Sequence, residues 1–254
     1  MSASSSLALL TKGQVESSVT VVGSYLSPYV RKVLACVRLK DLTYEIDPIV
    51  PFYGNADFKA HSPLRRIPLL FHEGHVINDS SVICEYLNDR FPDRGAPLYP
   101  AEPHLRAEAR CVEELADTRI CEVNIRGIWN EDVPPLADYC ESKLMPRTTT
   151  SARKRVFLFG EQPMAADIAL AASFRNLELA GDDLTTIFAP RWPLWSAYLQ
   201  RVLRHDCLAA YRHLEEASAR VKPSQVGGYR AALAAIGAPI SVHVNLGTEP
   251  KPTL

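Results

Sequence analysis

The stretch SVTVVGSYLSPYVRKVLACVRLK, residues 18–40, decides the fold of this chain. Its first five residues are mostly β-branched, which is typical of a buried strand. Ser27 and Pro28 follow, and serine is a favoured helix N-cap while proline is a favoured first helical residue. From Val30 onward the apolar residues recur at helical spacing. The stretch therefore predicts a strand that leads through a short turn into an amphipathic helix.

Downstream, the same signals continue over one more compact unit. Residues 41–50 return to an extended pattern, and residues 52–63 read as a broken helical connector. IPLLFHEGHVIND, residues 67–79, reads as two strands around a Glu-Gly turn. A second amphipathic helix over residues 80–92 ends at a Phe-Pro pair. The predicted order is β-α-β-α-β-β-α over residues 18–93.

The remainder of the chain is organised differently. Proline and glycine mark an exposed linker over residues 94–103. Helical periodicity then dominates residues 104–222, which predicts an all-helical second domain. We expect residues 1–17 to be a flexible tail. Residues 223–254 form a C-terminal extension of unassigned role, in which the alternating stretch ISVHV (240–244) could run extended along a surface.

Composition excludes several function classes. The chain has 254 residues, of which 47% are hydrophobic and 22% charged, as in ordinary folded proteins. Its formal net charge of −1 provides no field that would attract nucleic acid or an anionic membrane. The sequence contains no secretory signal pattern and no apolar run long enough to span a bilayer. We therefore expect a cytoplasmic protein that binds neither nucleic acid nor membrane.

Cysteine and histidine give no metal or disulfide pattern. The six cysteines are spread singly and never form C-x-x-C, so a reducing compartment would keep them as thiols. Cys36 and Cys84 fall inside the two predicted helices, where we expect them to be buried. His72 and His75 have a spacing that could bind a metal, but the residues around them favour a tight turn. We therefore expect no metal.

Three helix or strand starts could carry a ligand. The Ser27 hydroxyl lies beside unpaired N–H groups at the positive end of a helix dipole, so it is either a cap or a group that stabilises an anion. The Ile67-Pro68 bond is either trans or cis, and a cis bond would leave the Ile67 backbone to pair with a peptide-like ligand. Asp79 and Ser80 either cap the second helix or bind an ammonium and a carboxylate.

Four motifs in this order resemble the glutathione transferase family over residues 18–215. They are SPYVRK (27–32), SPLRRIPLL (62–70), NDSSVICEYL (78–87) and FLFGEQPMAADIALA (157–171). The resemblance implies a thioredoxin-like N-terminal domain followed by an all-α C-terminal domain. It also implies glutathione as co-substrate and a homodimer.

The resemblance assigns roles to individual residues. Ser27 falls where the family keeps a catalytic serine or cysteine. Ile67, ahead of a cis Pro68, would pair its backbone with the cysteinyl part of glutathione. Asp79 and Ser80 would hold the γ-glutamyl ammonium and carboxylate.

Aromatic and apolar residues near the turn are candidates for a pocket that takes a small apolar electrophile. They are Tyr25, Leu26 and Tyr29, with Trp129 as a possible addition from the helical domain. Ordinary core packing is the alternative for each of them.

Two departures from the family pattern bear on the stability of the second domain and on the reactions to be expected. Met164 stands where a Ser or Thr cap often precedes the residue that corresponds to Asp167, and methionine cannot cap, although Asp167 can still bond backbone N–H groups. Serine at position 27 argues against chemistry that requires a protein mixed disulfide. The sequence thus favours conjugation or addition-elimination. The alternatives are a non-catalytic glutathione-binding or scaffold protein, and a redox enzyme that uses one of the single cysteines.

Overall fold

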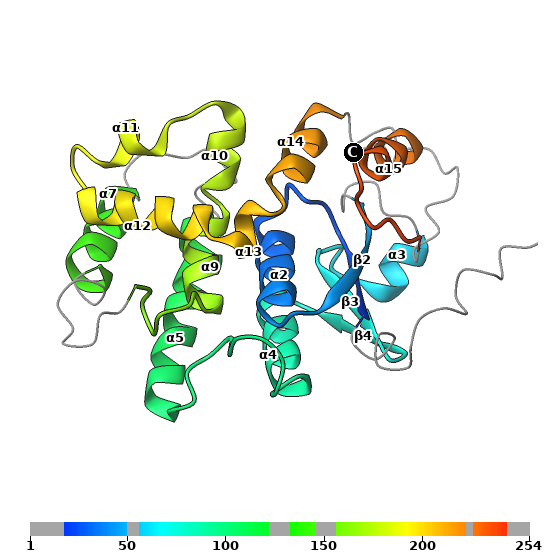
Figure 1. Ribbon diagram of the computed structural model, residues 1–254, viewed down its shortest axis with the longest axis horizontal. Coiled ribbons are helices and arrows are strands. Elements are labelled where there is room, and N and C mark those ends of the chain that lie inside the picture. Colours follow the sequence, from blue (N-terminus) through cyan, green and yellow to red (C-terminus); the bar gives the residue numbers. More distant parts are fainter. Residues whose placement is uncertain (1–17, 50–55, 122–132, 146–155, 222–225, 243–254) are drawn as a thin grey trace, which may run out of the picture.

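The computed structural model describes residues 18–49, 56–121, 133–145, 156–221 and 226–242 (Figure 1). The predicted tail over residues 1–17 and Trp129 lie outside the described residues. Among the helices that are described, none is long and apolar enough to cross a membrane.

The first unit is a four-stranded sheet flanked by helices. Its elements are β1 (Ser18–Val22), α2 (Pro28–Leu39), β2 (Thr43–Asp47), α3 (Ala56–His61), β3 (Leu69–His72), β4 (His75–Asn78) and α4 (Ser80–Arg90). The strands lie in the order β2-β1-β3-β4. This confirms the predicted βαβαββα order and the thioredoxin-like fold. The Glu73-Gly74 turn joins β3 to β4, so the predicted hairpin is also confirmed.

The directions of the four strands bring the three loops with candidate site residues to one edge of the sheet. β1 and β2 are parallel, whereas β3 is antiparallel to β1 and to β4. The carboxyl ends of β1, β2 and β4 therefore share an edge with the start of β3. The loops that carry Ser27, Pro68 and Asp79 all lie at this edge.

The regular elements in the described part of the second unit are all helices. They are α5 (Pro103–Leu115), η3 (Ala116–Ile120), α7 (Val133–Tyr139), η4 (Cys140–Leu144), α9 (Ala165–Ala172), α10 (Arg175–Ala180), α11 (Leu184–Phe188), α12 (Pro193–Arg204), α13 (Asp206–Ala209) and α14 (Arg212–Arg220). η3 and η4 are π-helical turns, which the apolar periodicity of the sequence does not distinguish from α-helix. All eight residues of α9 are buried, and this helix packs against α2, α5 and α12 at the centre of the molecule.

Asp167 fixes the start of α9. Its carboxylate accepts hydrogen bonds from the backbone N–H of Leu158 and of Met164, each at 2.9 Å, and from the hydroxyl of Tyr198 at 2.5 Å. The expectation that Asp167 bonds backbone N–H groups is confirmed, since this carboxylate supplies the capping that the Met164 side chain cannot.

The predicted linker over residues 94–103 is only partly exposed. Residues 92–95 lie at the surface, but Leu98 and Tyr99 are buried in the core, and the Ala96 N–H donates to the Leu39 carbonyl at 2.7 Å. The expectation of an exposed connector is therefore wrong for residues 98–100. Leu98 bonds Asn88 of α4 through its N–H and Tyr99 bonds Glu113 of α5 through its hydroxyl, so the two side chains join the hydrophobic core, which outweighs the turn-like composition around them.

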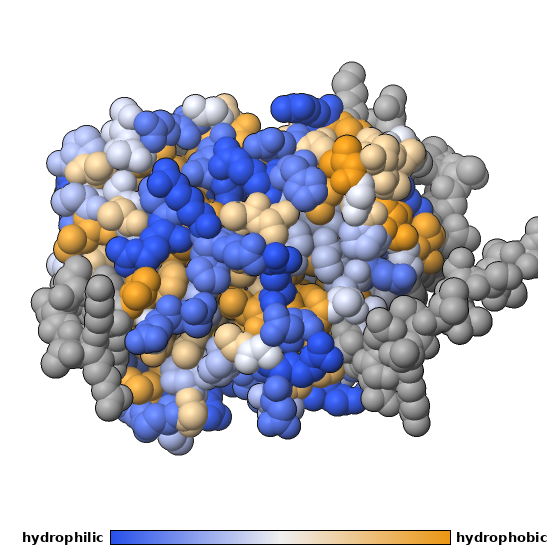
Figure 2. All heavy atoms as spheres, in the orientation of Figure 1, coloured by the Kyte–Doolittle hydropathy of each residue, from blue (hydrophilic) through white to orange (hydrophobic). Residues whose placement is uncertain are grey.

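The C-terminal extension folds back onto the sheet. Helix α15 (Val226–Ala235) is followed by an extended segment whose Ile240 pairs with Ile46 of β2 in a parallel bridge. The Ile46 N–H donates to the Pro239 carbonyl at 2.8 Å, and the Ser241 N–H donates to the Ile46 carbonyl at 2.9 Å. The face shown in Figure 2 is largely hydrophilic, with hydrophobic residues gathered at the upper right, where Figure 1 places α15.

A buried ion pair joins α2 to the helical unit. Arg31 and Glu215 of α14 are each 1% exposed and meet at 2.6 Å, while Arg175 forms an ion pair with the other oxygen of Glu215 at 3.2 Å. Arg31 also donates to the carbonyl of Ala172 at 2.5 Å and to that of Tyr25 at 3.2 Å. One guanidinium thus links the turn before α2 to helices α9 and α14 of the second unit.

Removing the charge of Glu215 is expected to destabilise the fold strongly. Glu215→Gln removes the carboxylate that faces the buried Arg31 guanidinium, whereas Arg175 keeps its ion pair with Glu178, and breaking a buried pair costs about 3–5 kcal/mol. The matched control is Asp206→Asn. Asp206 pairs with Arg38, another arginine of α2, but the side chains are 72% and 44% exposed, and exposed pairs contribute about 1 kcal/mol or less. Urea unfolding of both variants tests this, and equal losses would contradict it.

Candidate active site

A tight turn connects β1 to α2 at the shared edge of the sheet. The Gly23 N–H donates to the Asp47 carbonyl at 2.9 Å, and the Ser27 N–H donates to the Ser24 carbonyl at 3.0 Å. Gly23 has a φ of 153°, and a Cβ there would lie 2.5 Å from Cγ2 of Val30. Glycine is therefore required for the close approach of the turn to the first residues of α2. We call residues 23–27 the active turn.

Ser27 is the N-cap of α2. Its hydroxyl accepts a hydrogen bond from the Val30 N–H at 3.4 Å, at the long end for such a bond, and the side chain is partly exposed. Within the described part of the chain, this hydroxyl donates no hydrogen bond. Ser27 thus caps the helix weakly and has a proton to offer to a ligand at the positive end of the helix dipole.

The Ile67-Pro68 bond is cis. Pro68 directly precedes β3, whose Leu69 pairs with Val22, so the cis bond lies beside the active turn. A Cβ on Gly23 would lie 3.3 Å from Cβ of Ile67, which shows how near the two segments are. Among the described residues, the backbone of Ile67 has no hydrogen-bond partner.

Asp79 and Ser80 lie at the start of α4. Asp79 is the N-cap, and its carboxylate accepts from the N–H of Ser81 at 2.9 Å and of Val82 at 3.3 Å. Its φ is 73°, a left-handed conformation that costs free energy for a residue with a Cβ and often marks a functional site. The Asp79 side chain is exposed, whereas Ser80 is buried.

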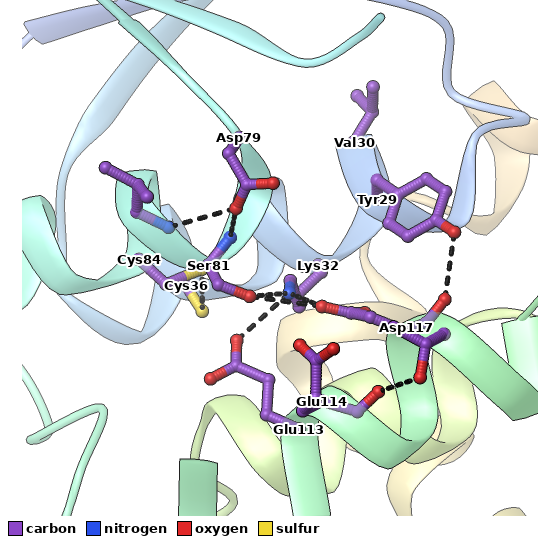
Figure 3. Close-up of polar contacts among 12 residues, drawn as sticks. Tyr29, Val30, Lys32, Cys36, Asp79, Ser81, Cys84, Glu113, Glu114 and Asp117 are labelled. Carbon is purple, nitrogen blue, oxygen red and sulfur yellow. Dashed lines mark hydrogen bonds and ion pairs between the residues drawn. The ribbon is translucent and has the colours of Figure 1, made fainter. Parts of the chain in front are cut away.

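A buried lysine ties the two helix starts to the helical unit (Figure 3). The Lys32 ammonium on α2 donates to the Ser81 hydroxyl on α4 at 2.9 Å. It also forms ion pairs with Glu113 of α5 at 3.0 Å and with Asp117 of η3 at 2.5 Å. The Ser81 hydroxyl in turn donates to the Asp117 carboxylate at 3.1 Å. The contacts fix the first turn of α4 relative to α2.

The charges in this cluster depend on one another. Burial lowers the pKa of Lys32, but the Glu113 and Asp117 carboxylates raise it by more, so the pKa lies above its ordinary value and the ammonium persists. Burial raises the pKa of Asp117, although Lys32 acts in the opposite direction. The bond to Lys32 is short, so we take the pair as ionised near neutral pH.

Of the three residues expected to line a pocket, two remain candidates. Leu26 and Tyr29 are partly exposed, and the Tyr29 hydroxyl donates to the Asp117 carbonyl at 3.0 Å. Tyr25 is 1% exposed and its hydroxyl bonds that of Tyr44 at 3.1 Å. Tyr25 is therefore a core residue, and its expected pocket role is not retained.

The two tyrosines near the active turn, Tyr25 and Tyr29, do not supply a base. Burial raises the pKa of Tyr25 and of Tyr29 far above the usual phenol value, so both stay neutral at physiological pH. Neither phenol is therefore suited to act as a base near the turn.

Three buried cysteines, Cys36, Cys84 and Cys121, are poor candidates for redox chemistry. Cys36 and Cys84 are buried, as predicted, with their sulfur atoms 3.4 Å apart. Burial raises the pKa of the Cys84 thiol, and it raises that of Cys121 to about 11. Thiols with such pKa values are protonated at neutral pH and react slowly.

The sequence pattern did not reveal the roles of Arg31 and Lys32. Consecutive cations in a helix normally indicate a solvated face, yet both side chains are 1% exposed. One signal for their burial was present in the sequence. The helix follows a buried strand, and the long helical second unit has to cover part of the first unit.

Comparison with known proteins supports the family resemblance. Residues 26–90 match the family model described as glutathione S-transferase, N-terminal domain. Protein LigF of Sphingobium sp. is 42% identical over 94 residues, which are 35% of this chain and 36% of LigF. Mouse glutathione S-transferase omega-1 is 23% identical over 189 residues, 73% of this chain and 78% of that protein.

A solved structure has the same fold. Glutathione transferase F2 from Populus trichocarpa superposes with a TM-score of 0.65 at 19% identity, covering 78% of this chain and 99% of that one. The chain spans only about a third of the length of LigF. With the cis proline and both helix starts at one sheet edge, the family-model match assigns residues 26–90 to the glutathione S-transferase N-terminal domain, and the superposition shows the fold of a glutathione transferase.

Proposed function

We propose that this protein is a glutathione transferase in which Ser27 stabilises the thiolate of bound glutathione. The observation that carries the proposal is the Ser27 hydroxyl, which is partly exposed at the N-terminus of α2 and donates to no described residue. The cis Ile67-Pro68 bond beside it supports the same assignment.

The proposed binding mode uses all three segments at the sheet edge. The unpartnered backbone of Ile67 would pair with the cysteinyl part of glutathione. The exposed carboxylate of Asp79 would bind the γ-glutamyl ammonium, and the backbone N–H and hydroxyl of Ser80, at the start of α4, would bind its carboxylate. The sulfur would then lie near Ser27.

The energy available from Ser27 matches what the reaction needs. A free thiol has a pKa of about 8.5, and lowering it by two units requires about 2.7 kcal/mol. A hydrogen bond to a charged group contributes about 1.5–3 kcal/mol, and a helix N-terminus adds about 0.3–1 kcal/mol. The serine therefore needs only to donate its proton in a hydrogen bond and never has to ionise.

The acceptor is proposed to be a small apolar electrophile that contacts Leu26 and Tyr29, attacked by conjugation or addition-elimination. The alternative is a non-catalytic glutathione-binding or scaffold protein on the same fold. A homodimer and a cytoplasmic location stay predictions from the sequence.

Ser27→Ala tests the role of the hydroxyl. Loss of one hydrogen bond to the thiolate is expected to raise the pKa of bound glutathione by about one to two pH units. Ultraviolet titration of the enzyme-glutathione complex measures this pKa directly, and kcat/KM near neutral pH is expected to fall roughly tenfold to hundredfold.

Ser27→Thr serves as the control because it keeps a hydroxyl at the same position. It is expected to retain a lowered thiol pKa. If wild type and Ser27→Ala both bind glutathione with an unshifted thiol, the serine is only a cap and the binding-protein alternative takes its place.

Asp79→Asn separates ligand binding from helix capping. Asparagine caps helices as well as aspartate does, so the urea midpoint is expected to stay unchanged. Loss of the charge is expected to raise KM for glutathione roughly tenfold, because a hydrogen bond between charged groups is weakened. An unchanged KM would exclude Asp79 from glutathione binding.

A further inference from the structure

We propose that Tyr229, in the C-terminal helix α15, is a positioning residue for the active turn. The chain thereby uses its last described segment to hold Ser27 in place. This inference rests on the proposed function, and it concerns a segment that sequence analysis left without a role.

The first contact is a chain of hydroxyls. Tyr229 is buried, and its hydroxyl lies 3.1 Å from Oγ of Ser24 in the active turn and 3.1 Å from Oγ of Ser218 in α14. Oγ of Ser24 also accepts from the Leu26 N–H at 3.2 Å. With Tyr229 donating to Ser218, the Ser24 hydroxyl donates to Tyr229 and each proton is used once.

The second contact comes from the next residue of α15. The Arg230 guanidinium donates to Oδ1 of Asp47 at 2.5 Å, and this carboxylate is fully buried. The backbone carbonyl of Asp47 accepts from the N–H of Gly23, the first residue of the active turn. Tyr229 therefore contacts Ser24 of the active turn, and the next residue, Arg230, contacts Asp47 of β2, which bonds the first residue of that turn.

The helix α15 is itself held at both ends. Tyr229 near its start is bonded to Ser218, and beyond its end Ile240 pairs with Ile46 of β2. A helix fixed in this way presents a rigid hydroxyl to Ser24. Because Ser24 is buried, removing that partner leaves its O–H without an acceptor among the described residues and favours other conformations of the turn.

The test compares two tyrosine-to-phenylalanine variants. Tyr229→Phe removes the hydroxyl that faces the turn. Tyr211→Phe is the matched control, because the Tyr211 hydroxyl is also buried but donates to the Leu34 carbonyl in the middle of α2, at 3.0 Å. Both variants keep the ring, so both are expected to fold, which urea unfolding checks.

Two readouts are needed. Hydrogen exchange followed by mass spectrometry reports the amides of residues 23–27 without any ligand, and we expect several-fold faster exchange in Tyr229→Phe but not in Tyr211→Phe. Thiol titration of bound glutathione is expected to give a higher thiol pKa and a lower kcat in Tyr229→Phe, with KM for glutathione within about twofold.

The outcomes separate this inference from the proposed function. If wild type does not lower the thiol pKa, the proposed function fails, and the exchange data alone decide whether Tyr229 holds the turn. If wild type lowers the thiol pKa and Tyr229→Phe matches Tyr211→Phe in both exchange and titration, the positioning role is wrong. Ser24→Ala combined with Tyr229→Phe should add nothing to either single change, and additive effects would also overturn the proposal.

Discussion

The burial of α2 on both of its sides is the constraint on which the structure depends. One side packs on the sheet and the other on α9, so the charges of Arg31 and Lys32 must be neutralised inside the protein. The helical unit supplies Glu215 to the first and Glu113 with Asp117 to the second. Two buried ion networks therefore set how the two units meet, and they do so within five residues of Ser27.

This placement connects folding with the proposed chemistry. Arg31 holds the carbonyl of Tyr25, the residue two before Ser27, and Lys32 holds the hydroxyl of Ser81, the residue after Ser80. The proposed thiolate and γ-glutamyl positions are thus both held in place by side chains of α2. A site shared between two loops needs such a common support if its parts are to keep a fixed separation.

Sequence patterns predicted the order of the first unit because each strand or helix there carries a local signal, such as the Ser27-Pro28 start and the Glu73-Gly74 turn. They also indicated Ser27, Pro68 and Asp79 as a set, since helix and strand starts are visible in sequence. They could not reveal the buried state of Arg31 or Lys32, because it depends on helices that are more than 70 residues away in the chain. The π-helical turn that carries Asp117 has no periodicity of its own to read.

The pairing of Ile240 with β2 has a further consequence for solubility. An uncovered edge strand presents free N–H and C=O groups that can template pairing with another chain. In this protein, Pro239 and Ser241 satisfy both backbone groups of Ile46. The short extended segment after α15 thus covers the edge of β2 and prevents edge-to-edge association. A shortened chain that lacked this segment would expose an aggregation-prone strand on an otherwise intact domain.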